Sequence, residues 1–422
     1  MSPSLGYDAI VLGAGVAGLT AATRLAESGA RVCVLAKGVG STHLAPGTID
    51  VLGYEAGERV EEPGHSLTEF VAAHPEHPYA LIGPDAIGPA LSWFSARIEQ
   101  GPQPGYRYTG GVERNHLLPT ALGVVRPSAL VPETMAAGHA RDPAPVCVVG
   151  VRVLRDFHAR LCAANLERAG WPARAIELDV DVGRAEANSL GLARRFDDPG
   201  FRSVFAARLV PLLHSGERVG MPAVLGLKDP HGAWSGLEER LGHRVFEIPT
   251  LPPSAPGIRV YDALTSALRA ARGRLVLGAE VLDADRHSDR IVSVRAHASG
   301  HDTVYRARWF ILATGGLTSG AIALGSDWQA RDTVLGLNLR GAPGPGEPRF
   351  VARYFDHQPM SSVGIAVDST LRADGVENVF VAGASLPGAE PWREGSGEGI
   401  ALATGHFAAQ AVIDREGVTA TA

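Results

Sequence analysis

Residues Tyr7–Leu35 read YDAIVLGAGVAGLTAATRLAESGARVCVL, the strongest structural signal in this sequence of 422 residues. An apolar run, Ala9–Leu12, leads into Gly13, Gly15 and Gly18, which have GxGxxG spacing. Gly13 permits a tight turn, Gly15 removes a side chain where a pyrophosphate approaches the backbone, and Gly18 lets a helix pack on the sheet. The pattern predicts a strand that turns into a helix whose N-terminus faces phosphates.

A second strand completes the βαβ unit. The helix carries Leu19, Ala22 and Leu25 at core-facing spacing, ends at Gly29 and is followed by the apolar stretch Val32–Leu35. A lone GxGxxG is a weak signal, but here strand, glycines, helix and second strand fall in register. The stretch therefore predicts nucleotide binding.

The end of the second strand departs from the dinucleotide-binding pattern. Dinucleotide folds usually place Asp or Glu at this position to bind the ribose hydroxyls. This sequence has Ala36 there, followed by Lys37. Phosphate binding is therefore predicted, with Lys37 among the cofactor-binding candidates, while recognition of an adenosine ribose stays open.

Composition excludes several classes of protein. The net charge of −6 and the lack of a basic stretch argue against nucleic-acid binding. Only Cys33, Cys147 and Cys162 are present, none in CxxC spacing, so no disulfide framework, zinc site or iron–sulfur site is expected. A reducing, cytoplasmic setting follows. No apolar window of about 18 residues exists, so no helix is expected to span a bilayer.

The loop after the second strand is rich in Gly, Ser and Thr, which is typical of a loop that wraps phosphate or flavin. Ser41 and Thr42 offer hydroxyl donors, and His43 is the first titratable group expected near an isoalloxazine. The alternative for His43 is an ordinary position in a surface loop.

Two later segments add glycine turns. The strand-like RWFILATGG ends in Thr314 and Gly315, a second turn close to phosphate, and NVFVAG ends at Gly383. A long helix then begins at GSGEGIALATG, where Gly397 and Gly399 leave the start sterically open. Its N-terminal amides are expected to face the flavin pyrimidine edge. The alternative is that these glycines only permit tight packing.

The predicted fold class is α/β: a Rossmann-like, two-part flavin-binding domain with an inserted α+β cap domain. Residues 1–75 form the first flavin-binding part, 76–250 the cap and substrate domain, and 251–422 the second flavin-binding part. Within the last part, Asp262 is expected to cap a helix that stops at Gly273.

The motifs GAGVAG, STHLAPGTIDVLG, ILATGG and VAGASLPGAEPWREGSGEGIALATG together resemble the fumarate reductase and succinate dehydrogenase flavoprotein superfamily. The middle motifs VGVRVLRDFHARLCAANL, VGMPAVLGL and VFEIPTLPPSAPGIR look like the B subunit of anaerobic glycerol-3-phosphate dehydrogenase. The resemblance runs nearly the whole chain.

This resemblance implies a catalytic pair of A and B subunits docked to an iron–sulfur C subunit at the membrane. The complex oxidises sn-glycerol 3-phosphate, a small phosphorylated substrate, to dihydroxyacetone phosphate and reduces quinone. The chain would then be cytoplasmic and peripheral to the inner face of the cell membrane through its partners. The B subunit of the family is described as carrying FMN.

The cofactor is expected to be a flavin, but its form stays open. A GxGxxG helix facing a pyrophosphate predicts FAD, because FMN has one phosphate and no adenosine. Ala36, which replaces the ribose-binding carboxylate, is compatible with a mononucleotide, and the resemblance implies FMN. FMN is placed narrowly ahead, with FAD the close alternative.

The expected half-reaction moves a hydride from substrate C2 to the flavin while a base takes the C2 hydroxyl proton. The base candidates are His43, His357 and Glu394, and Arg353 or Arg393 is expected to bind the substrate phosphate. Arg393 and Glu394 have a structural alternative, a surface ion pair.

Two other functions stay open. In the first alternative, the chain is a flavin-bearing relay or scaffold whose partner holds the substrate site. In the second, it is a stand-alone oxidoreductase acting on another small substrate. Because no cysteines are spaced to hold a cluster, electrons must leave to another protein or to a soluble acceptor. This favours a component of a larger complex.

Overall fold

The computed structural model describes residues 5–183 and 187–416, which form two compact units. The first unit comprises 1–40, 64–94 and 264–422 as far as these are described, and the second comprises 41–63 and 95–263. The predicted insertion between two flavin-binding parts has different limits, since residues 76–94 group with the first unit and 41–63 with the second. The outer ends of the predicted parts, 1–4 and 417–422, lie outside the described residues.

The first unit is built on a sheet with strand order β13-β2-β1-β16-β15-β14, in which β21 also pairs with β16. Its strands are β1 (Leu5–Leu12), β2 (Val32–Ala36), β13 (Arg274–Leu277), β14 (Glu280–His287), β15 (Arg290–Ala298), β16 (His301–Leu312) and β21 (Val379–Val381). Strands β13, β2, β1, β16 and β21 are parallel, whereas β15 pairs antiparallel with the first half of β16 and β14 pairs antiparallel with β15. The predicted βαβ start of the chain is confirmed.

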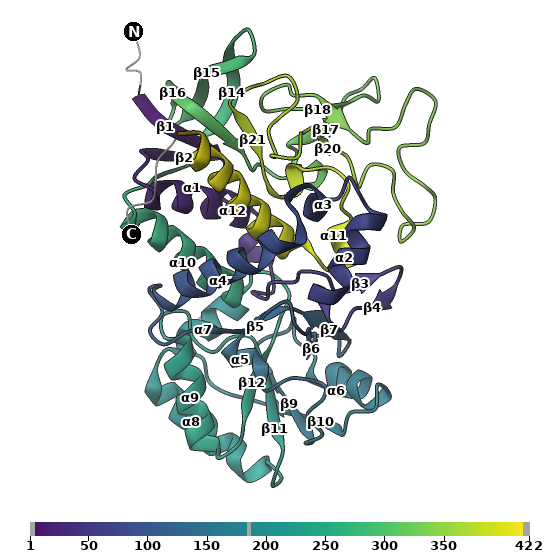
Figure 1. The fold of residues 1–422 in the computed structure, drawn as a ribbon. Helices are drawn as coiled ribbons and strands as arrows, with labels where there is room; N and C mark the ends of the chain where they lie inside the picture. The colour runs from purple at the N-terminus through teal and green to yellow at the C-terminus, as the bar shows by residue number, and fades with distance from the viewer. Residues whose placement is uncertain (1–4, 184–186, 417–422) are drawn as a thin grey trace. The chain divides into compact units, whose positions relative to one another are not determined.

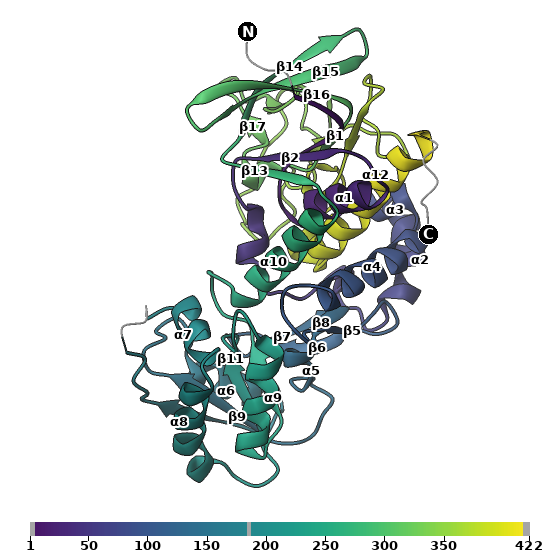
Figure 2. The ribbon, with the colours of Figure 1, turned by 90° about the vertical axis from the view of Figure 1, so that its left-hand side faces the viewer.

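Two helices pack together on one face of this sheet, as Figures 1 and 2 show. They are α1 (Val16–Glu27) and α12 (Gly397–Glu416). A Cβ atom at Gly405 would lie 2.4 Å from the backbone oxygen of Ala17, so the two backbones touch where the helices cross. Further along, Arg24 donates to Gln410 at 3.0 Å. The crossing fixes α12 against the beginning of α1.

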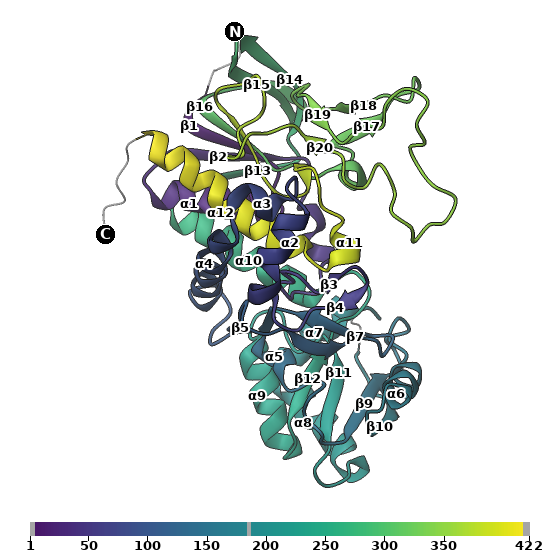
Figure 3. The ribbon, with the colours of Figure 1, turned by 45° about the vertical axis from the view of Figure 1, so that its right-hand side comes forward.

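Short helices and hairpins complete the first unit. The helices are α2 (Pro63–Ala73), α3 (Pro78–Ile82), α4 (Ile87–Glu99) and α11 (Pro391–Glu394), and the strands are β17 (Ile322–Leu324), β18 (Ala330–Asp332), β19 (Leu339–Arg340) and β20 (Gly364–Ile365). Helices α2, α3 and α11 gather around the start of α12 (Figure 3).

Helix α10 (Ala255–Ala270) corrects one expectation, because Asp262 lies in its middle and does not cap it. The helix begins eight residues earlier than predicted, and the Ser254 hydroxyl accepts a hydrogen bond from the Gly257 N–H at 3.0 Å. Proline is tolerated in a first helical turn, so the Pro-rich segment enters the helix instead of ending before it.

The second unit has its own four-stranded sheet, with order β10-β9-β11-β12, and all its pairs are parallel. These strands are β9 (Val146–Val151), β10 (Ala173–Leu178), β11 (Arg218–Pro222) and β12 (Val245–Ile248), and the helices are α5 (Glu133–Ala136), α6 (Ala159–Arg168), α7 (Ser189–Phe196), α8 (Pro199–Leu209) and α9 (Pro230–Leu241). Figures 1 and 3 show α8 and α9 on one face and α6 on the other.

Short antiparallel pairs lie beside this sheet: β3 (Tyr54–Glu55) with β4 (Glu58–Arg59), β5 (Tyr108–Gly110) with β8 (Leu130–Pro132), and β6 (His116–Pro119) with β7 (Val125–Ser128). The sequence predicts a mixture of helices and strands for the inserted domain. The structure adds that the main sheet is parallel, because helices connect its successive strands.

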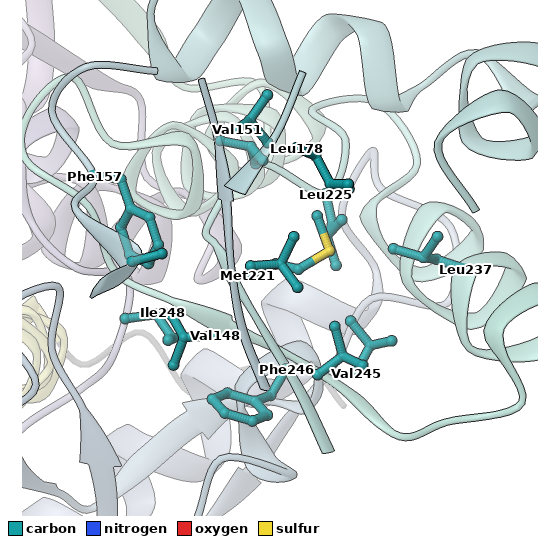
Figure 4. Packing of buried hydrophobic residues seen from close by; sticks show 14 of the residues in the cluster. Val148, Val151, Phe157, Leu178, Met221, Leu225, Leu237, Val245, Phe246 and Ile248 are labelled. Atoms are coloured by element: carbon teal, nitrogen blue, oxygen red, sulfur yellow. The ribbon is translucent and has the colours of Figure 1, made fainter. Parts of the chain in front are cut away.

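The second unit has a continuous apolar core. Figure 4 shows Val148, Phe157 and Ile248 on one side of the strands and Leu225, Leu237 and Val245 on the other. Cys147 and Cys162 belong to this core, and burial raises the pKa of the Cys147 thiol to about 11. Such cysteines behave as small apolar side chains.

A buried ion pair lies in the same unit. The Arg259 guanidinium donates to both carboxylate oxygens of Glu247, at 2.7 and 2.9 Å, and both side chains are 0% exposed. Thr134 and the Leu225 N–H also donate to Glu247, so the carboxylate is well satisfied. Removing one partner of such a pair typically costs about 3–5 kcal/mol. The pair thus ties β12 to α10 and to the segment after β11.

Candidate functional site

The carboxyl edge of the parallel sheet brings together three of the glycine turns predicted from the sequence. Gly13 N–H donates to the Leu35 carbonyl at 2.9 Å, and Ala313 N–H donates to the Leu12 carbonyl at 2.8 Å. Ala382 N–H in turn donates to the Leu312 carbonyl at 2.9 Å. The carboxyl ends of strands β2, β1, β16 and β21 therefore lie side by side. In open α/β sheets, ligands bind at this kind of edge.

The three glycines of the GxGxxG motif are required for different structural reasons. A Cβ atom at Gly13, whose φ is +110°, would lie 2.2 Å from the Ala313 oxygen, and one at Gly18 would lie 2.1 Å from the Gly13 oxygen. Gly13 and Gly18 are thus required by the protein's own packing. A Cβ at Gly15 would meet no atom within 4 Å. The space in front of Gly15 is open, as a phosphate group at the start of α1 requires.

The second and third turns are held to each other. Ser385 donates its hydroxyl to the Gly315 carbonyl at 2.9 Å, and the Gly383 N–H donates to the Thr404 hydroxyl of α12 at 2.8 Å. The Thr314 hydroxyl is buried and has no hydrogen-bond partner in the described part of the chain. It is available to a bound cofactor, and contact of Thr314 and Gly315 with a cofactor stays a prediction.

Helix α12 begins beyond the start of α1. The helices touch at Ala17 and Gly405, and Gly397 precedes Gly405 by eight residues, which is about 12 Å of helix. Gly399 is buried, and a Cβ at Gly397 would lie 3.3 Å from the Pro391 side chain. The first turns of α12 therefore extend past the start of α1 at the carboxyl edge, where its N-terminal amides are available to a ligand.

Lys37 lies at the end of β2 and forms an exposed ion pair, with Nζ 2.8 Å from Glu280 Oε1. Contact between Lys37 and a cofactor stays a prediction. The neighbouring Ala36 is buried and has no side chain that could bind a ribose.

Ser41, Thr42 and His43 belong to the second unit and follow the start of the 3-10 helix Gly40–Leu44. The His43 ring meets Tyr261 edge-on at 4.8 Å, and its Nε2 is buried with no hydrogen-bond partner among the described residues. Burial lowers the pKa of His43, while the charge of Asp262 raises it in part. The imidazole is thus neutral at neutral pH and able to accept a proton.

Glu394, the second base candidate, is largely buried beside the start of α12. Its carboxylate accepts hydrogen bonds from His77 Nε2 at 3.2 Å, from the Ser396 hydroxyl at 2.6 Å and from the Glu390 N–H at 2.7 Å. Burial raises its pKa, but these donors outweigh burial and the net pKa is lowered. A carboxylate that is held ionised by three donors is a weak base.

His357, the third candidate, has a different environment. Its Nδ1 lies 2.9 Å from Glu390 Oε2, and its side chain is 59% exposed. Ser361 donates to the other oxygen of Glu390 at 3.0 Å, which fixes the carboxylate. A carboxylate on Nδ1 orients the ring and leaves Nε2 directed elsewhere. This arrangement suits a proton acceptor.

The two phosphate candidates lie near this pair. Arg393 Nε is 3.6 Å from Glu390 Oε2, Arg393 Nη1 donates to the Phe355 carbonyl at 2.6 Å, and the guanidinium lies over Trp392. Arg353 is exposed, and within residues 5–183 and 187–416 its guanidinium has no ion-pair partner. Arg393 is partly engaged, so Arg353 is the more available cation.

Sequence reasoning missed His77 and Glu390. Glu390 precedes Glu394 by four residues in AEPWREG, and it is the N-cap of the short helix α11, of which Glu394 is the last residue. His77 stands directly before Pro78, the first residue of α3, and proline at this position signals a helix start. Neither signal indicates the partner of the side chain.

Metal-ligating clusters and membrane-spanning helices are both absent from the described part of the chain. No group of three or more His, Cys, Asp or Glu side chains there is arranged to hold a metal ion. None of the helices described combines the length and apolar character that crossing a bilayer requires.

A parallel sheet whose carboxyl edge carries three glycine turns, one of them open toward the start of α1, defines a nucleotide-binding α/β protein. The family model described as "FAD binding domain" matches residues 8–400. The B subunit of anaerobic glycerol-3-phosphate dehydrogenase from Pectobacterium atrosepticum is 31% identical over 424 residues, which cover 96% of this chain and 98% of the relative.

A protein of Halobacterium salinarum, named as a probable B subunit of the same enzyme, is 33% identical over 434 residues, with 96% and 98% coverage. Among solved structures, "The structure of the open conformation of a flavocytochrome c3 fumarate reductase" gives a TM-score of 0.45 at 10% identity, covering 98% of this chain and 79% of that chain.

The chain belongs to the FAD-binding domain family and to the family of anaerobic glycerol-3-phosphate dehydrogenase B subunits. The resemblance, the α/β flavoprotein fold and the flavin-dependent oxidoreductase class predicted from the sequence are confirmed. The cofactor is a flavin, and the family model names FAD. The relatives are named as B subunits, which places them in complexes of more than one chain.

The open space at Gly15 generates a prediction. In Gly15→Val the side chain occupies the space that a phosphate needs, while no protein atom lies within 4 Å of its Cβ. The variant is expected to fold and to bind flavin about ten- to a hundredfold more weakly, because a hydrogen bond to a charged group contributes about 1.5–3 kcal/mol. Fluorescence titration of the apoprotein with flavin measures this.

Gly6→Val is the matched control, since Gly6 lies in β1, is exposed and also has no atom within 4 Å of its added Cβ. It should bind flavin like the wild type. Wild-type affinity in Gly15→Val would show that the cofactor lies elsewhere.

Proposed function

We propose that this chain is the flavoprotein B subunit of a glycerol-3-phosphate dehydrogenase that oxidises sn-glycerol 3-phosphate to dihydroxyacetone phosphate. The main support for the proposal is the similarity to named B subunits, which covers nearly the whole of this chain and of each relative. The open glycine turn at the start of α1 supports it, because it supplies the flavin site that such a protein needs.

The proposed form of the flavin is FAD. The family model supports FAD, and so does the open space at Gly15, which lies at the N-terminus of a 12-residue helix where a pyrophosphate binds well. FMN, which the resemblance implied, is the alternative. Gly15 and Thr314 are proposed to contact the phosphates, and the first turn of α12, with Gly397 and Gly399, the flavin ring.

A bound flavin supplies the hydride acceptor. The chain's own residues must remove the hydroxyl proton at substrate C2. We assign this role to His357, because Glu390 holds its Nδ1 at 2.9 Å and its ring is exposed to solvent. His43 is the second choice. The three donors on Glu394 make it the weakest base of the three.

The substrate phosphate requires a cation close to the base. Arg353 lies four residues before His357, and Arg393 shares Glu390 with it. A guanidinium binds a phosphate dianion through two parallel hydrogen bonds. Arg353 is proposed as the main contact and Arg393 as a second one that also holds the loop through Phe355.

The partners are proposed to be an A-type flavoprotein subunit and a C-type iron–sulfur subunit that attaches the complex to the inner face of the cell membrane. Electrons would leave through these partners to quinone. The resemblance supports this proposal, and so do the names of the relatives, which are B subunits of a larger enzyme.

The first test is anaerobic reduction. The purified chain, loaded with flavin and mixed with glycerol 3-phosphate, is expected to lose its absorbance at the oxidised flavin maximum, whereas glycerol without the phosphate should have little effect. A chain that keeps its absorbance alone, but loses it when the A-type partner is added, would place the substrate site in the partner. No loss in either case would contradict the proposed substrate.

The second test concerns the base. His357→Gln is expected to lower the rate of flavin reduction by about 10²- to 10⁴-fold, the usual contribution of a general base, with flavin content unchanged. The matched control is His287→Gln, since His287 is another exposed histidine near a carboxylate, 3.9 Å from Asp285. Stopped-flow reduction under anaerobic conditions measures both variants. A rate within about threefold of wild type for His357→Gln would transfer the role to His43 or to the A-type partner.

A further inference from the structure

His77 is a buried histidine for which the proposed reaction has no use. It is 1% exposed and packs edge-on against Phe70 at 4.9 Å. Its Nδ1 accepts a hydrogen bond from the Tyr79 N–H at 3.1 Å, which caps α3. Because Nδ1 accepts, the ring proton lies on Nε2, which donates to Glu394 at 3.2 Å. Both ring nitrogens are therefore committed.

The partner of His77 lies at the start of α12. Glu394 precedes Gly397 by three residues, and Ser396, which also donates to it, is 0% exposed. A carboxylate next to a helix N-terminus is stabilised by the helix dipole. The hydrogen bonds to Glu394 thus fix the short connection between α11 and α12.

Close backbone packing supports the same contact. A Cβ atom at Gly388 would lie 2.4 Å from the backbone oxygen of Glu76, so the two segments touch with no room for a side chain. The Tyr79 hydroxyl lies 3.5 Å from the Ser396 carbonyl. The turn between α2 and α3 therefore packs directly against the segment that leads into α12. Figure 3 shows α2 and α3 beside the start of α12.

We propose that His77 and Glu394 are positioning residues that hold the N-terminus of α12 against the flavin, an inference that rests on the proposed function. The positive end of a helix dipole stabilises negative charge, and such charge accumulates on the flavin pyrimidine edge on reduction. A start of α12 that moves away would bind flavin more weakly and lower its reduction potential. Neither residue needs to touch the substrate.

The two nitrogens of His77 can be tested separately. His77→Asn keeps an oxygen that caps α3 but loses the donor to Glu394. His77→Gln keeps a donor that reaches toward Glu394 but loses the cap. The full-length chain is loaded with flavin, and the flavin dissociation constant and the midpoint potential are measured together with the melting temperature of the apoprotein.

His77→Asn is expected to raise the dissociation constant about three- to tenfold, the effect of losing one hydrogen bond, and to shift the potential to more negative values. Glu394→Gln is expected to raise the dissociation constant to a similar extent. His77→Gln should restore both properties toward wild type even though α3 loses its cap. The control is His74→Asn, because His74 is an exposed residue of the same turn whose ring contacts Phe70. It should change neither property.

The proposal is overturned if His77→Asn and Glu394→Gln lower the melting temperature but leave the dissociation constant at its wild-type value, and if His77→Asn also leaves the potential unchanged. If these variants do not fold, Ser396→Ala removes one donor to Glu394 and is judged by the same two properties. Failure of the proposed function would be seen separately, as a wild-type chain that binds flavin but is not reduced by glycerol 3-phosphate alone or with its partner.

Discussion

The close approach of Gly13 to the Ala313 carbonyl is the constraint on which the first unit depends. It joins the end of β1 to the end of β16, strands that lie far apart in the sequence, and it leaves no space for a side chain at Gly13. With these two turns in contact, Gly15 faces open space and α1 presents its N-terminus there. The crossing of α12 over α1 at Gly405 and Ala17 then brings the last helix to the same edge. One backbone contact thus sets where the starts of α1 and α12 lie, the places proposed for the phosphates and the flavin ring.

The side chains predicted to take part in the reaction are held by specific hydrogen-bond and ion-pair partners as well as by burial. Glu390 orients His357 and contacts Arg393, while Glu394, one helical turn away, is saturated by His77, Ser396 and a backbone amide. The carboxylates of the N-cap and of the last residue of α11 therefore have different proposed tasks: Glu390 orients the proposed base, and Glu394 holds the start of α12. In the second unit, the Arg259 and Glu247 pair plays a purely structural part, since every oxygen of that carboxylate is occupied by a donor.

Local patterns were sufficient to predict the βαβ start, the turn after β16, the strand β21 and the helix that begins at Gly397, because each combines a strand or helix pattern with glycines at fixed spacing. The prediction of α10 from Asp262 was wrong, because Ser254, which stands between Pro253 and Pro256, caps the helix instead. The contact of His77 with Glu394 spans 317 positions of the sequence, and no local pattern encodes it. The grouping of residues 76–94 with the first unit depends on the same kind of distant contact, so it too could not be predicted.

The central claim is that the edge at Gly15 binds the pyrophosphate of a dinucleotide flavin. Acid extraction of the purified chain, followed by chromatography of the released flavin, tests it most directly. The account predicts close to one equivalent of FAD per chain. One equivalent of FMN, or no flavin after reconstitution with FAD, would contradict it.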